Sequence, residues 1–356
     1  MTFPIITHIN QVLPAIEGRK EFIHVVKDGY QVIDYVYEDG DSFEDPIRRE
    51  CRGLKFDLAG NIIARPLHKF FNYGQKLITY DWSKPHTIMT KMDGSMVHTA
   101  IIDRKLRLCT RMGITEQSIA AEKLLTVTQN SQLGGIALAD VTVIFEYTAP
   151  DNRIVIEYEK PALTILAVRR NLTGVYFDHE SVVELGEILG IPVVDVHSDI
   201  RLGDDNIASI RENTTGIEGY VVAWEDGTRT KIKTDEYCQM HRAVSYFERE
   251  SMILPVVLDM QCDDIYPNLS QDRKDRLFEY EAAVLKEFNL YVGSVQIALD
   301  TYQRHNLTRK EYALWVQEKV PKGMQGAFFA AIDGKSIPEA VKSCLIRNPE
   351  LLSVRW

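Results

Sequence analysis

The chain lacks the features of a membrane, secreted or zinc-binding protein. Its 356 residues contain no apolar run near the ~18 residues of a membrane span. The N-terminus lacks the charged start and apolar stretch of a secretory signal. Only five cysteines occur, and no two form a Cys-x-x-Cys pair, which argues against a zinc ribbon and indicates reduced thiols. We therefore expect a cytoplasmic protein that does not bind a membrane. We also expect it to be a monomer.

An excess of positive charge is also absent. The formal net charge is −10 at pH 7. This argues against a protein that coats nucleic acid nonspecifically, because such proteins are basic. It is compatible with an enzyme that holds nucleic acid in a local basic cleft.

The residue pattern divides the chain into two parts. Residues 20–240 alternate β-rich runs and turns, whereas helical periodicity dominates from about Asp235. This predicts an α+β domain of antiparallel sheets with flanking helices, residues 1–245, followed by an all-helical domain, residues 246–356. The β-rich runs are 22–26, 30–37, 54–57, 61–65, 97–102, 106–110, 141–147, 163–168, 219–224 and 228–233. The helical patterns are 116–128, 180–189, 204–211, 236–249, 272–288, 292–304, 309–318 and 338–345.

Residues 91–95 read Lys-Met-Asp-Gly-Ser and follow a short apolar run. The tetrad can place the amine of Lys91 near the carboxylate of Asp93, and Gly94 allows the backbone to approach a ligand closely. An amine held there could attack phosphorus and form a covalent bond to a nucleotide. Three fixed residues occur by chance roughly once in ten chains of this length, so the tetrad needs support from other residues.

A second basic cluster, Lys231-Ile232-Lys233, provides part of that support. In a strand, Lys231 and Lys233 face the same side. Two like charges side by side are unfavourable unless an anion such as a triphosphate lies between them. An isolated Lys-x-Lys pair is more often a solvated strand face. Here the predicted hairpin partner carries Glu218, an acid on the same sheet.

Three further residues could contact a nucleotide. Glu146 lies within an apolar run, where an unpaired carboxylate would cost several kcal/mol. It either faces solvent or accepts hydrogen bonds from ribose hydroxyls. Arg52 suits a fork-like contact to phosphate or ribose, and Lys69 could bring a point charge to a terminal phosphate. The neighbouring Phe70 and Phe71 are expected in the core.

The expected chemistry requires a neutral lysine amine. A free lysine has a pKa of ~10.4 and is a poor nucleophile at pH 7. Lys231, Lys233 and a divalent ion near Lys91 would lower the pKa of that amine. The same cations would stabilise the charge on the phosphoryl oxygens in the transition state. Mg²⁺ is the expected ion because it binds phosphates with one or two carboxylates, and Mn²⁺ is an alternative.

The order of these motifs resembles the covalent nucleotidyltransferase superfamily of DNA ligases, RNA ligases and capping guanylyltransferases. Longer strings are similar to the bacteriophage RNA ligase 1 family, which reseals broken tRNA. These strings lie at residues 50–53, 65–72, 91–95, 149–155, 217–221 and 231–237. The resemblance spans about residues 20–265. It implies a nucleotidyltransferase fold for the first domain and an RNA-specificity role for the helical one.

The resemblance also implies roles for single residues. Lys91 would become linked to AMP, and Glu146 would bind ribose or organise the site. The other implied ATP contacts come from Tyr35, Arg52, Lys69, Asp93, Lys231 and Lys233. Among these, Lys69 would lie toward the γ-phosphate, and Lys231 and Lys233 would grip the α-phosphate.

The implied metal contacts involve Glu218, which would hold the water shell of the ion. Asp263 and Asp264 match positions implicated in metal binding, and Tyr237 matches a position implicated in ligation. Arg111 stands where the family often has lysine. Met92 replaces an acidic residue that is common within the family's tetrad.

The implied reaction consumes ATP and joins an RNA 5′-phosphate to a 3′-OH. Lys91 takes AMP from ATP, the AMP moves to the 5′-phosphate, and the 3′-OH then displaces it. Broken tRNA or other single-stranded RNA ends are the expected partners. A ligase for nicked duplexes is the nearest alternative, although such enzymes usually append a small β-barrel where helices are predicted here. A noncatalytic RNA-binding relative is the other alternative.

Overall fold

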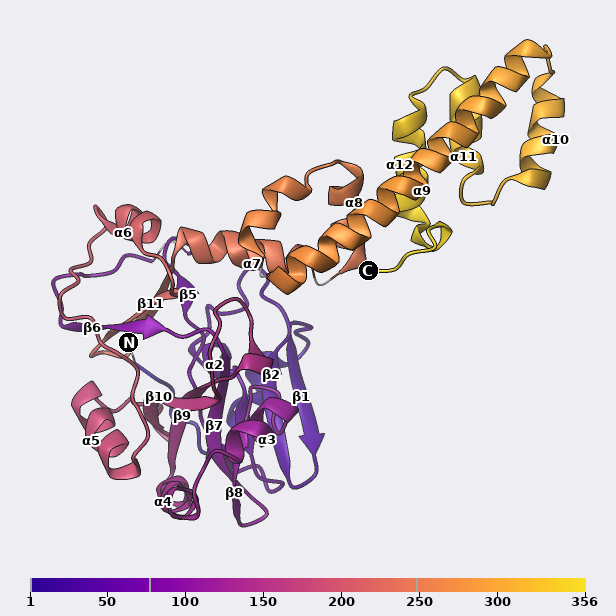
Figure 1. Ribbon diagram of the computed structural model, residues 1–356. Coiled ribbons are helices and arrows are strands. Elements are labelled where there is room, and N and C mark those ends of the chain that lie inside the picture. Colours follow the sequence, from indigo (N-terminus) through magenta and orange to yellow (C-terminus); the bar gives the residue numbers. More distant parts are fainter. Residues whose placement is uncertain (1, 77, 248, 270) are drawn as a thin grey trace. The chain divides into compact units, whose positions relative to one another are not determined.

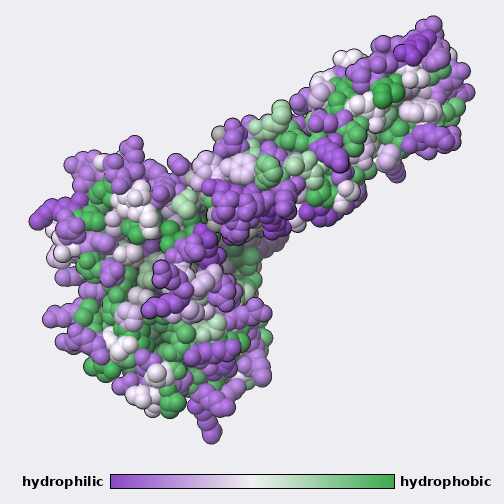
Figure 2. Space-filling view, in the orientation of Figure 1, coloured by the Kyte–Doolittle hydropathy of each residue, from purple (hydrophilic) through white to green (hydrophobic). Residues whose placement is uncertain are grey.

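The structure, a computed structural model, describes residues 2–76, 78–247, 249–269 and 271–356 (Figure 1). The chain forms two compact units, Met1–Cys238 (unit 1) and Gln239–Trp356 (unit 2). The boundary between them lies in helix α7 (Asp235–Phe247), the same helix that contains the predicted domain boundary at residues 245–246. Hydrophilic side chains cover much of the visible surface of each unit (Figure 2).

Unit 1 contains three four-stranded sheets, which confirms the predicted α+β class. The first sheet has the order β1 (Phe22–Lys27), β2 (Tyr30–Tyr35), β3 (Leu54–Phe56) and β4 (Ile62–Ala64). The second has the order β10 (Ala162–Arg170), β9 (Val141–Thr148), β7 (Ser95–Ile102) and β8 (Lys105–Cys109). The third has the order β5 (Phe71–Asn72), β12 (Arg229–Lys233), β11 (Gly219–Trp224) and β6 (His86–Lys91).

The predicted hairpins form because their turns suit tight antiparallel connections. Strands β1 and β2 pair around Gly29, which has φ +80°, and β11 and β12 pair around Gly227, which has φ +86°. Between β7 and β8, Asp103 and Arg104 adopt positive φ without glycine. Asp tolerates this conformation because its short side chain bonds locally.

Short helices flank the sheets of unit 1. They are α1 (Leu13–Ile16), α2 (Pro46–Glu50), α3 (Glu116–Glu122), α4 (Val127–Leu138), α5 (His179–Leu189) and α6 (Ile207–Asn213). The prediction of one helix over 116–128 was wrong. Thr126 and Gln129 form a capping box that starts a new helix, α4, after residues 123–126. Helix α3 packs against β8, α4 against β9, and α5 against β10.

Unit 2 is helical in its described residues. Its helices are α8 (Glu250–Leu258), α9 (Gln271–Arg304), α10 (Arg309–Lys319), α11 (Gln325–Ile332) and α12 (Ile337–Arg347). The predicted break between 288 and 292 is absent, because Gly293 continues the helix without a cap. The sequence patterns missed α8 and α11, which are short. In the described chain, no helix combines the length and apolar character needed to cross a membrane.

The core of unit 1 positions the strands that carry the candidate site. Strand β9 lies inside its sheet and is buried along its whole length. Phe70 and Leu67 pack with Ile144 and Ala167 in a small cluster beneath this region. Phe71 is also buried, so the expectation that Phe70 and Phe71 belong to the core is confirmed.

Candidate active site

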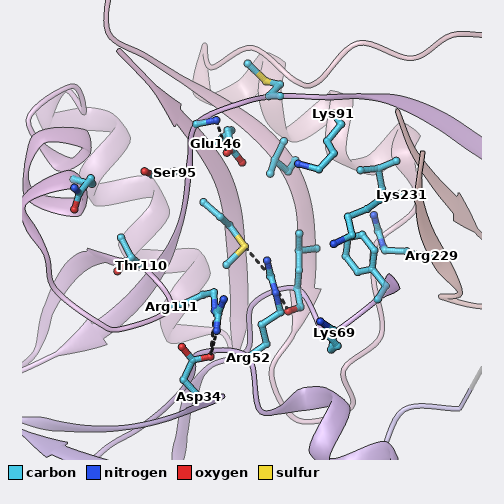
Figure 3. A pocket seen from close by; sticks show the side chains of 18 of the residues that line it. Asp34, Arg52, Lys69, Lys91, Ser95, Thr110, Arg111, Glu146, Arg229 and Lys231 are labelled. Carbon is cyan, nitrogen blue, oxygen red and sulfur yellow. Dashed lines mark hydrogen bonds and ion pairs between the residues drawn. The ribbon is translucent and has the colours of Figure 1, made fainter. Parts of the chain in front are cut away.

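Unit 1 contains a cavity of about 760 Å³ with a strongly basic wall (Figure 3). The chain as a whole is acidic, yet seven basic and only two acidic side chains line this cavity. The basic ones are Arg52, Lys69, Lys91, Arg111, Arg229, Lys231 and Lys233. A concave wall of this charge attracts polyanions.

Lys91 and Lys233 lie on either side of Gly219 in the third sheet. We call such a set of residues, paired directly across neighbouring strands, a row of the sheet. Gly219 on β11 pairs with Lys91 on β6 and with Lys233 on β12. A Cβ on Gly219 would lie 2.0 Å from the carbonyl oxygen of Ile232, and its φ is +144°. Only glycine therefore lets β11 and β12 pair this closely beside the two lysines.

The carboxylate of Glu218 joins these two lysines. Its Oε2 lies 2.6 Å from Nζ of Lys91, and its Oε1 lies 2.9 Å from Nζ of Lys233. Glu218 is 4% exposed, so the two ammonium groups compensate a carboxylate that is almost removed from water. The predicted nucleophile and two of its predicted partners are thus in direct contact.

Glu146 enters the cavity from β9 and is almost fully buried. Its Oε1 accepts a hydrogen bond of 3.1 Å from the backbone N–H of Gly94. Burial raises the pKa of Glu146 to about 8, although the charge of Lys91 opposes the shift. The solvent-facing alternative for Glu146 was wrong, because neighbouring strands flank β9 on both edges and both of its faces are covered.

Gly94 is required for a reason other than the expected one. A Cβ at this position would lie 2.4 Å from the carbonyl oxygen of Tyr147. The glycine thus allows the loop after Lys91 to pack against β9, and this contact brings its N–H to Glu146.

Lys231 occupies the next row of the sheet, where Val221 pairs with both Lys231 and Met89. Its Nζ lies 5.5 Å from the ring centroid of Phe70. Burial, together with the positive charges of Arg52 and Lys91, lowers the pKa of Lys231 to about 7. A phosphate beside Lys231 would reverse this effect.

Arg52 and Lys69 line the same cavity on segments that precede Lys91 in the chain. Arg52 donates a hydrogen bond of 3.3 Å to the carbonyl oxygen of Leu67. Nζ of Lys69 forms an ion pair of 2.8 Å with Glu38 and lies 4.9 Å from the ring centroid of Tyr35. These contacts hold both cationic side chains in place at the cavity wall.

Tyr35 and Arg111 form another part of the wall. The guanidinium of Arg111 lies 4.2 Å from the ring centroid of Tyr35 and donates a hydrogen bond of 2.9 Å to Asp34. These residues come from β2 and the turn after β8, which are far apart in the sequence.

Asp93 and Tyr237 meet outside the cavity lining. Asp93 is 2% exposed, and its Oδ2 accepts hydrogen bonds of 2.7 Å from the backbone N–H groups of Val155 and Ile156. Its Oδ1 accepts a 2.7 Å hydrogen bond from the hydroxyl of Tyr237. Burial raises the pKa of Tyr237 above its usual value. In this arrangement Asp93 fixes the segment after β9 and the start of α7.

The proposed metal ligands do not gather in the described residues. No group of three His, Cys, Asp or Glu side chains in the described part of the chain could hold a metal. Asp263 is exposed in unit 2, within the short helix Cys262–Asp264, and the side chain of Asp264 lies outside those described. Glu218 is the carboxylate beside Lys91. It suits Mg²⁺, which takes most ligands from phosphate and water.

Replacing Glu146 by Gln should stabilise unit 1 at pH 8. Folding raises the pKa of this carboxyl from 4.5 to about 8, so the folded protein retains a proton that the unfolded chain releases, and stability falls as pH rises through this window. Gln stays neutral and can accept the same hydrogen bond from Gly94. We expect the variant to gain ~1 kcal/mol or more of unfolding free energy at pH 8 and little at pH 5. Denaturant titrations at both pH values measure this, and an equal difference at both would contradict it.

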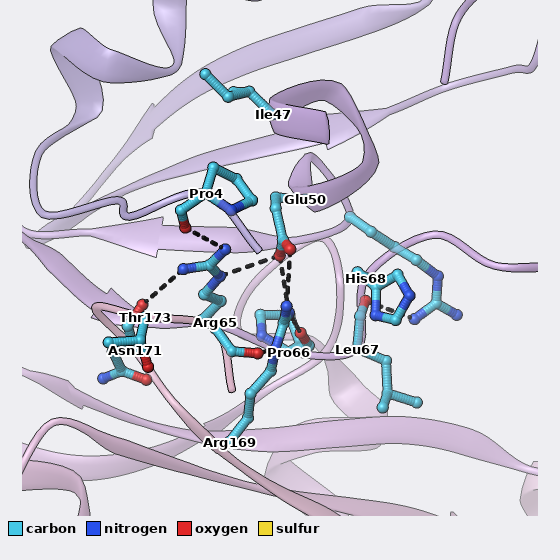
Figure 4. Close-up of polar contacts among 12 residues, drawn as sticks. Pro4, Ile47, Glu50, Arg65, Pro66, Leu67, His68, Arg169, Asn171 and Thr173 are labelled. Carbon is cyan, nitrogen blue, oxygen red and sulfur yellow. Dashed lines mark hydrogen bonds and ion pairs between the residues drawn. The ribbon is translucent and has the colours of Figure 1, made fainter. Parts of the chain in front are cut away.

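Sequence reasoning missed two features around the cavity. The first is a buried ion network in which Glu50 contacts both Arg65 and Arg169 (Figure 4). No local pattern reveals this network, because Arg169 is 119 residues from Glu50. The second is Arg229, which lines the cavity two residues before Lys231. Extending the alternation of Lys-x-Lys by one step would have found it.

A lysine amine in a strongly basic cavity wall is typical of proteins that bind phosphorylated ligands. Comparison with known sequences specifies the family. A profile of the RNA ligase family matches residues 50–237, so the chain belongs to that family and is an RNA ligase. The profile covers every cavity-lining cation named above, Lys91 included.

Two relatives illustrate the match. RNA ligase 1 of bacteriophage TS2126 is 27% identical over 321 residues, which cover 85% of this chain and 78% of the relative. The protein named "Putative RNA ligase" of Thermovibrio ammonificans is 27% identical over 288 residues, covering 74% and 72% respectively. A solved archaeal ATP-dependent RNA ligase is similar with a TM-score of 0.49 and 16% identity, over 80% of this chain and 79% of the other.

Proposed function

We propose that the protein is an ATP-dependent RNA ligase that uses Lys91 as the attacking amine. The observation that carries this proposal is the direct contact of Lys91 with Glu218, and of Glu218 with Lys233, at a strongly basic cavity wall.

The cavity offers distinct surroundings for the parts of ATP. Met89 and Val221 form neighbouring apolar positions on the sheet, and Leu166 and Val194 also line the cavity. A flat purine fits among these side chains. Glu146 would accept from ribose, and the phosphates would lie toward the lysines and Arg52.

The first step forms a P–N bond. Nζ of Lys91 attacks the α-phosphorus, and the bond from that phosphorus to the bridging oxygen breaks, so pyrophosphate leaves with the electron pair. The amine must first lose a proton, and Oε2 of Glu218 lies within proton-transfer reach at 2.6 Å. Lys231 and Lys233 would stabilise the added charge on the phosphoryl oxygens. Bound Mg²⁺ would neutralise phosphate charge.

The next two steps act on RNA. A 5′-phosphate oxygen displaces Lys91 from the AMP phosphorus, which restores the amine. The RNA 3′-OH then attacks the activated 5′-phosphorus, and AMP leaves as the phosphodiester forms. We infer that unit 2 contributes to the choice of RNA and that tRNA broken in its anticodon loop is a natural substrate.

A side-by-side ligation assay tests this function. Broken tRNA, linear RNA with a 5′-phosphate and nicked DNA duplexes are offered with ATP and Mg²⁺. Sealing of the RNA ends supports the proposal, and broken tRNA should be sealed fastest. Exclusive sealing of the nicked duplex would establish the alternative ligase. A protein that takes up no AMP label from ATP would be a noncatalytic relative.

ATP binding should take up protons above about pH 7. In the free cavity, burial lowers the pKa of Lys231 to about 7, so its amine is largely neutral at pH 8. A triphosphate stabilises the ammonium form, so binding at pH 8 should take up about one proton, and affinity should fall by up to tenfold per pH unit above 7. Calorimetry with a nonhydrolysable ATP analogue in two buffers measures this uptake.

A matched pair of variants separates Lys231 from other groups in that experiment. Lys231→Met should abolish most of the uptake, whereas Lys105→Met, at an exposed position on β8, should keep it. Unchanged uptake by Lys231→Met would show that another group takes up the proton.

A further inference from the structure

Arg229 extends the row of cations on β12 by one step. Arg229, Lys231 and Lys233 alternate along the strand and all line the cavity. Alternate residues of a strand are ~7 Å apart along its axis. Arg229 therefore lies beyond Lys231, farther from Lys91 and Lys233, which flank Gly219 at the other end of the pairing (Figure 3).

This position lies beside the apolar part of the cavity. In the row of Lys231, the sheet presents Val221 and Met89. In the row of Arg229, it presents the small residues Ala223 and Thr87. The small side chains of Ala223 and Thr87 leave space in the row of Arg229. A base that packs on Val221 and Met89 could therefore extend one of its edges into that space, toward Arg229.

A bulge in the second sheet adds to the same apolar region. The register of β10 with β9 shifts between Ile165 and Ala167, so Leu166 is the extra residue. A bulge of this kind re-aims a side chain, and Leu166 lines the cavity. Leu166, Met89 and Arg229 also line a neighbouring cavity of about 850 Å³. Arg229 therefore stands at the far end of the apolar part, where the two cavities adjoin.

The guanidinium of Arg229 is held in place without a carboxylate among the described residues. Its Cζ lies 4.1 Å from the ring centroid of Tyr176, and the hydroxyl of Tyr176 accepts a 3.2 Å hydrogen bond from the backbone N–H of His68. The Nε of Arg229 is buried and has no hydrogen-bond partner in the described chain. A buried donor without an acceptor is unfavourable, so this guanidinium has hydrogen-bonding capacity that the described chain does not use.

We propose that Arg229 contacts the base of the bound nucleotide and donates a hydrogen bond to one of its ring nitrogens. This inference rests on the proposed function, because it takes ATP as the ligand. A guanidinium has five N–H donors and no acceptor, so its partner on adenine must be N1, N3 or N7. Arg229 is thereby a specificity-determining residue, and it acts on binding of the base and not on the transfer of AMP.

A binding cycle with modified nucleotides tests the contact. Lys91→Ala provides the background, because it prevents covalent transfer and leaves a simple equilibrium. Calorimetry compares ATP with 1-deaza-, 3-deaza- and 7-deaza-ATP, with and without Arg229→Met. We expect Arg229→Met to weaken ATP binding about tenfold, as for loss of one charge-assisted hydrogen bond. The deaza analogue that lacks the accepting nitrogen should bind the Lys91→Ala protein about tenfold more weakly than ATP does. Adding Arg229→Met should not weaken the binding of this analogue any further.

Control variants distinguish this contact from a structural role. Arg170→Met removes an exposed arginine that lies over another aromatic ring, Phe177, and should leave all four affinities unchanged. Arg229→Gln keeps a donor and should recover part of the loss. An equal loss with all four nucleotides, or no loss with any, would overturn the assignment. Failure of the wild-type protein to take up AMP would instead refute the proposed function, while the binding cycle still reports on Arg229.

Discussion

Lys91→Ala should take up no AMP from ATP labelled at the α-phosphate, whereas the wild-type protein should form a stable protein–AMP adduct. The variant lacks the amine that would form the P–N bond. Lys233, the other lysine beside Glu218 and Gly219, lies on the neighbouring strand β12 and pairs with the opposite carboxylate oxygen, Oε1. We expect a loss of at least a thousandfold in labelling, because removal of a covalent nucleophile leaves only background transfer. Gel detection of the labelled protein measures the adduct.

The fold should survive this change. Glu218 keeps an ion pair of 2.9 Å with Lys233 when Lys91 is absent, so no carboxylate is left unpaired. Lys84→Ala is the matched control, since Lys84 is exposed and pairs only weakly with Asp81, and it should label like the wild-type protein. Labelling of Lys91→Ala at the wild-type rate would show that the nucleophile is misassigned.

Glu50→Gln should destabilise unit 1 by ~3–5 kcal/mol, the cost of breaking a buried ion pair. Glu50 lies between two guanidinium groups, at 3.0 Å from Nε of Arg65 and 2.7 Å from an Nη of Arg169. These three side chains are at most 1% exposed. Without the carboxylate, two buried cations would face each other uncompensated. Denaturant unfolding at pH 7, followed by fluorescence of Trp82 and Trp224 in unit 1, measures the loss.

The pH dependence of this network has a definite sign. Although burial alone would raise it, the charges of Arg169 and Arg65 hold the pKa of Glu50 at about 2. The carboxylate thus contributes stability above its ordinary pKa of 4.5, and this contribution is lost as pH falls toward 2. The difference between wild type and Glu50→Gln should therefore narrow below about pH 4. Glu122→Gln, which removes a half-buried partner of Arg107, should cost at most ~1 kcal/mol.

The network also explains how Arg52 and Lys69 reach the cavity. Arg169 donates a 2.7 Å hydrogen bond to the carbonyl oxygen of Pro66, and the N–H of Lys69 donates to the carbonyl of Arg49 at 2.7 Å. These hydrogen bonds therefore connect the segments around residues 50 and 67, which carry Arg52 and Lys69 to the cavity wall. Loss of Glu50 should weaken nucleotide binding as well as folding.

Local signals in the sequence predicted the strands of unit 1 well. Alternating β-rich runs joined by Asp-Gly turns gave β1, β2, β11 and β12 with boundaries within two residues. Helix boundaries were less accurate where a cap competes with periodicity. The capping box at Thr126 divided one predicted helix, and Gly293 failed to divide another.

The candidate site was only partly visible in the sequence because its contacts join distant residues. The spacing of Lys231 and Lys233 predicted their common face, and strand pairing places Lys91 in the same row as Lys233. By contrast, Arg169, one of the two partners of Glu50, is more than a hundred positions away from it, and Asp93 binds backbone N–H groups that have no sequence signature. The requirement for Gly94 comes from the packing of the loop after Lys91 against β9, which is also a contact between distant residues.

Under the proposed mechanism, the sharing of Glu218 by two lysines would make the local charge change during each catalytic cycle. Once Lys91 carries a nucleotide, its nitrogen is no longer cationic, and the carboxylate keeps Lys233 as its remaining counter-charge in this row. The loaded form would then attract a hydrated divalent ion more strongly than the unloaded one. Loading of Lys91 with AMP would in this way favour metal binding for the following transfer of AMP to RNA.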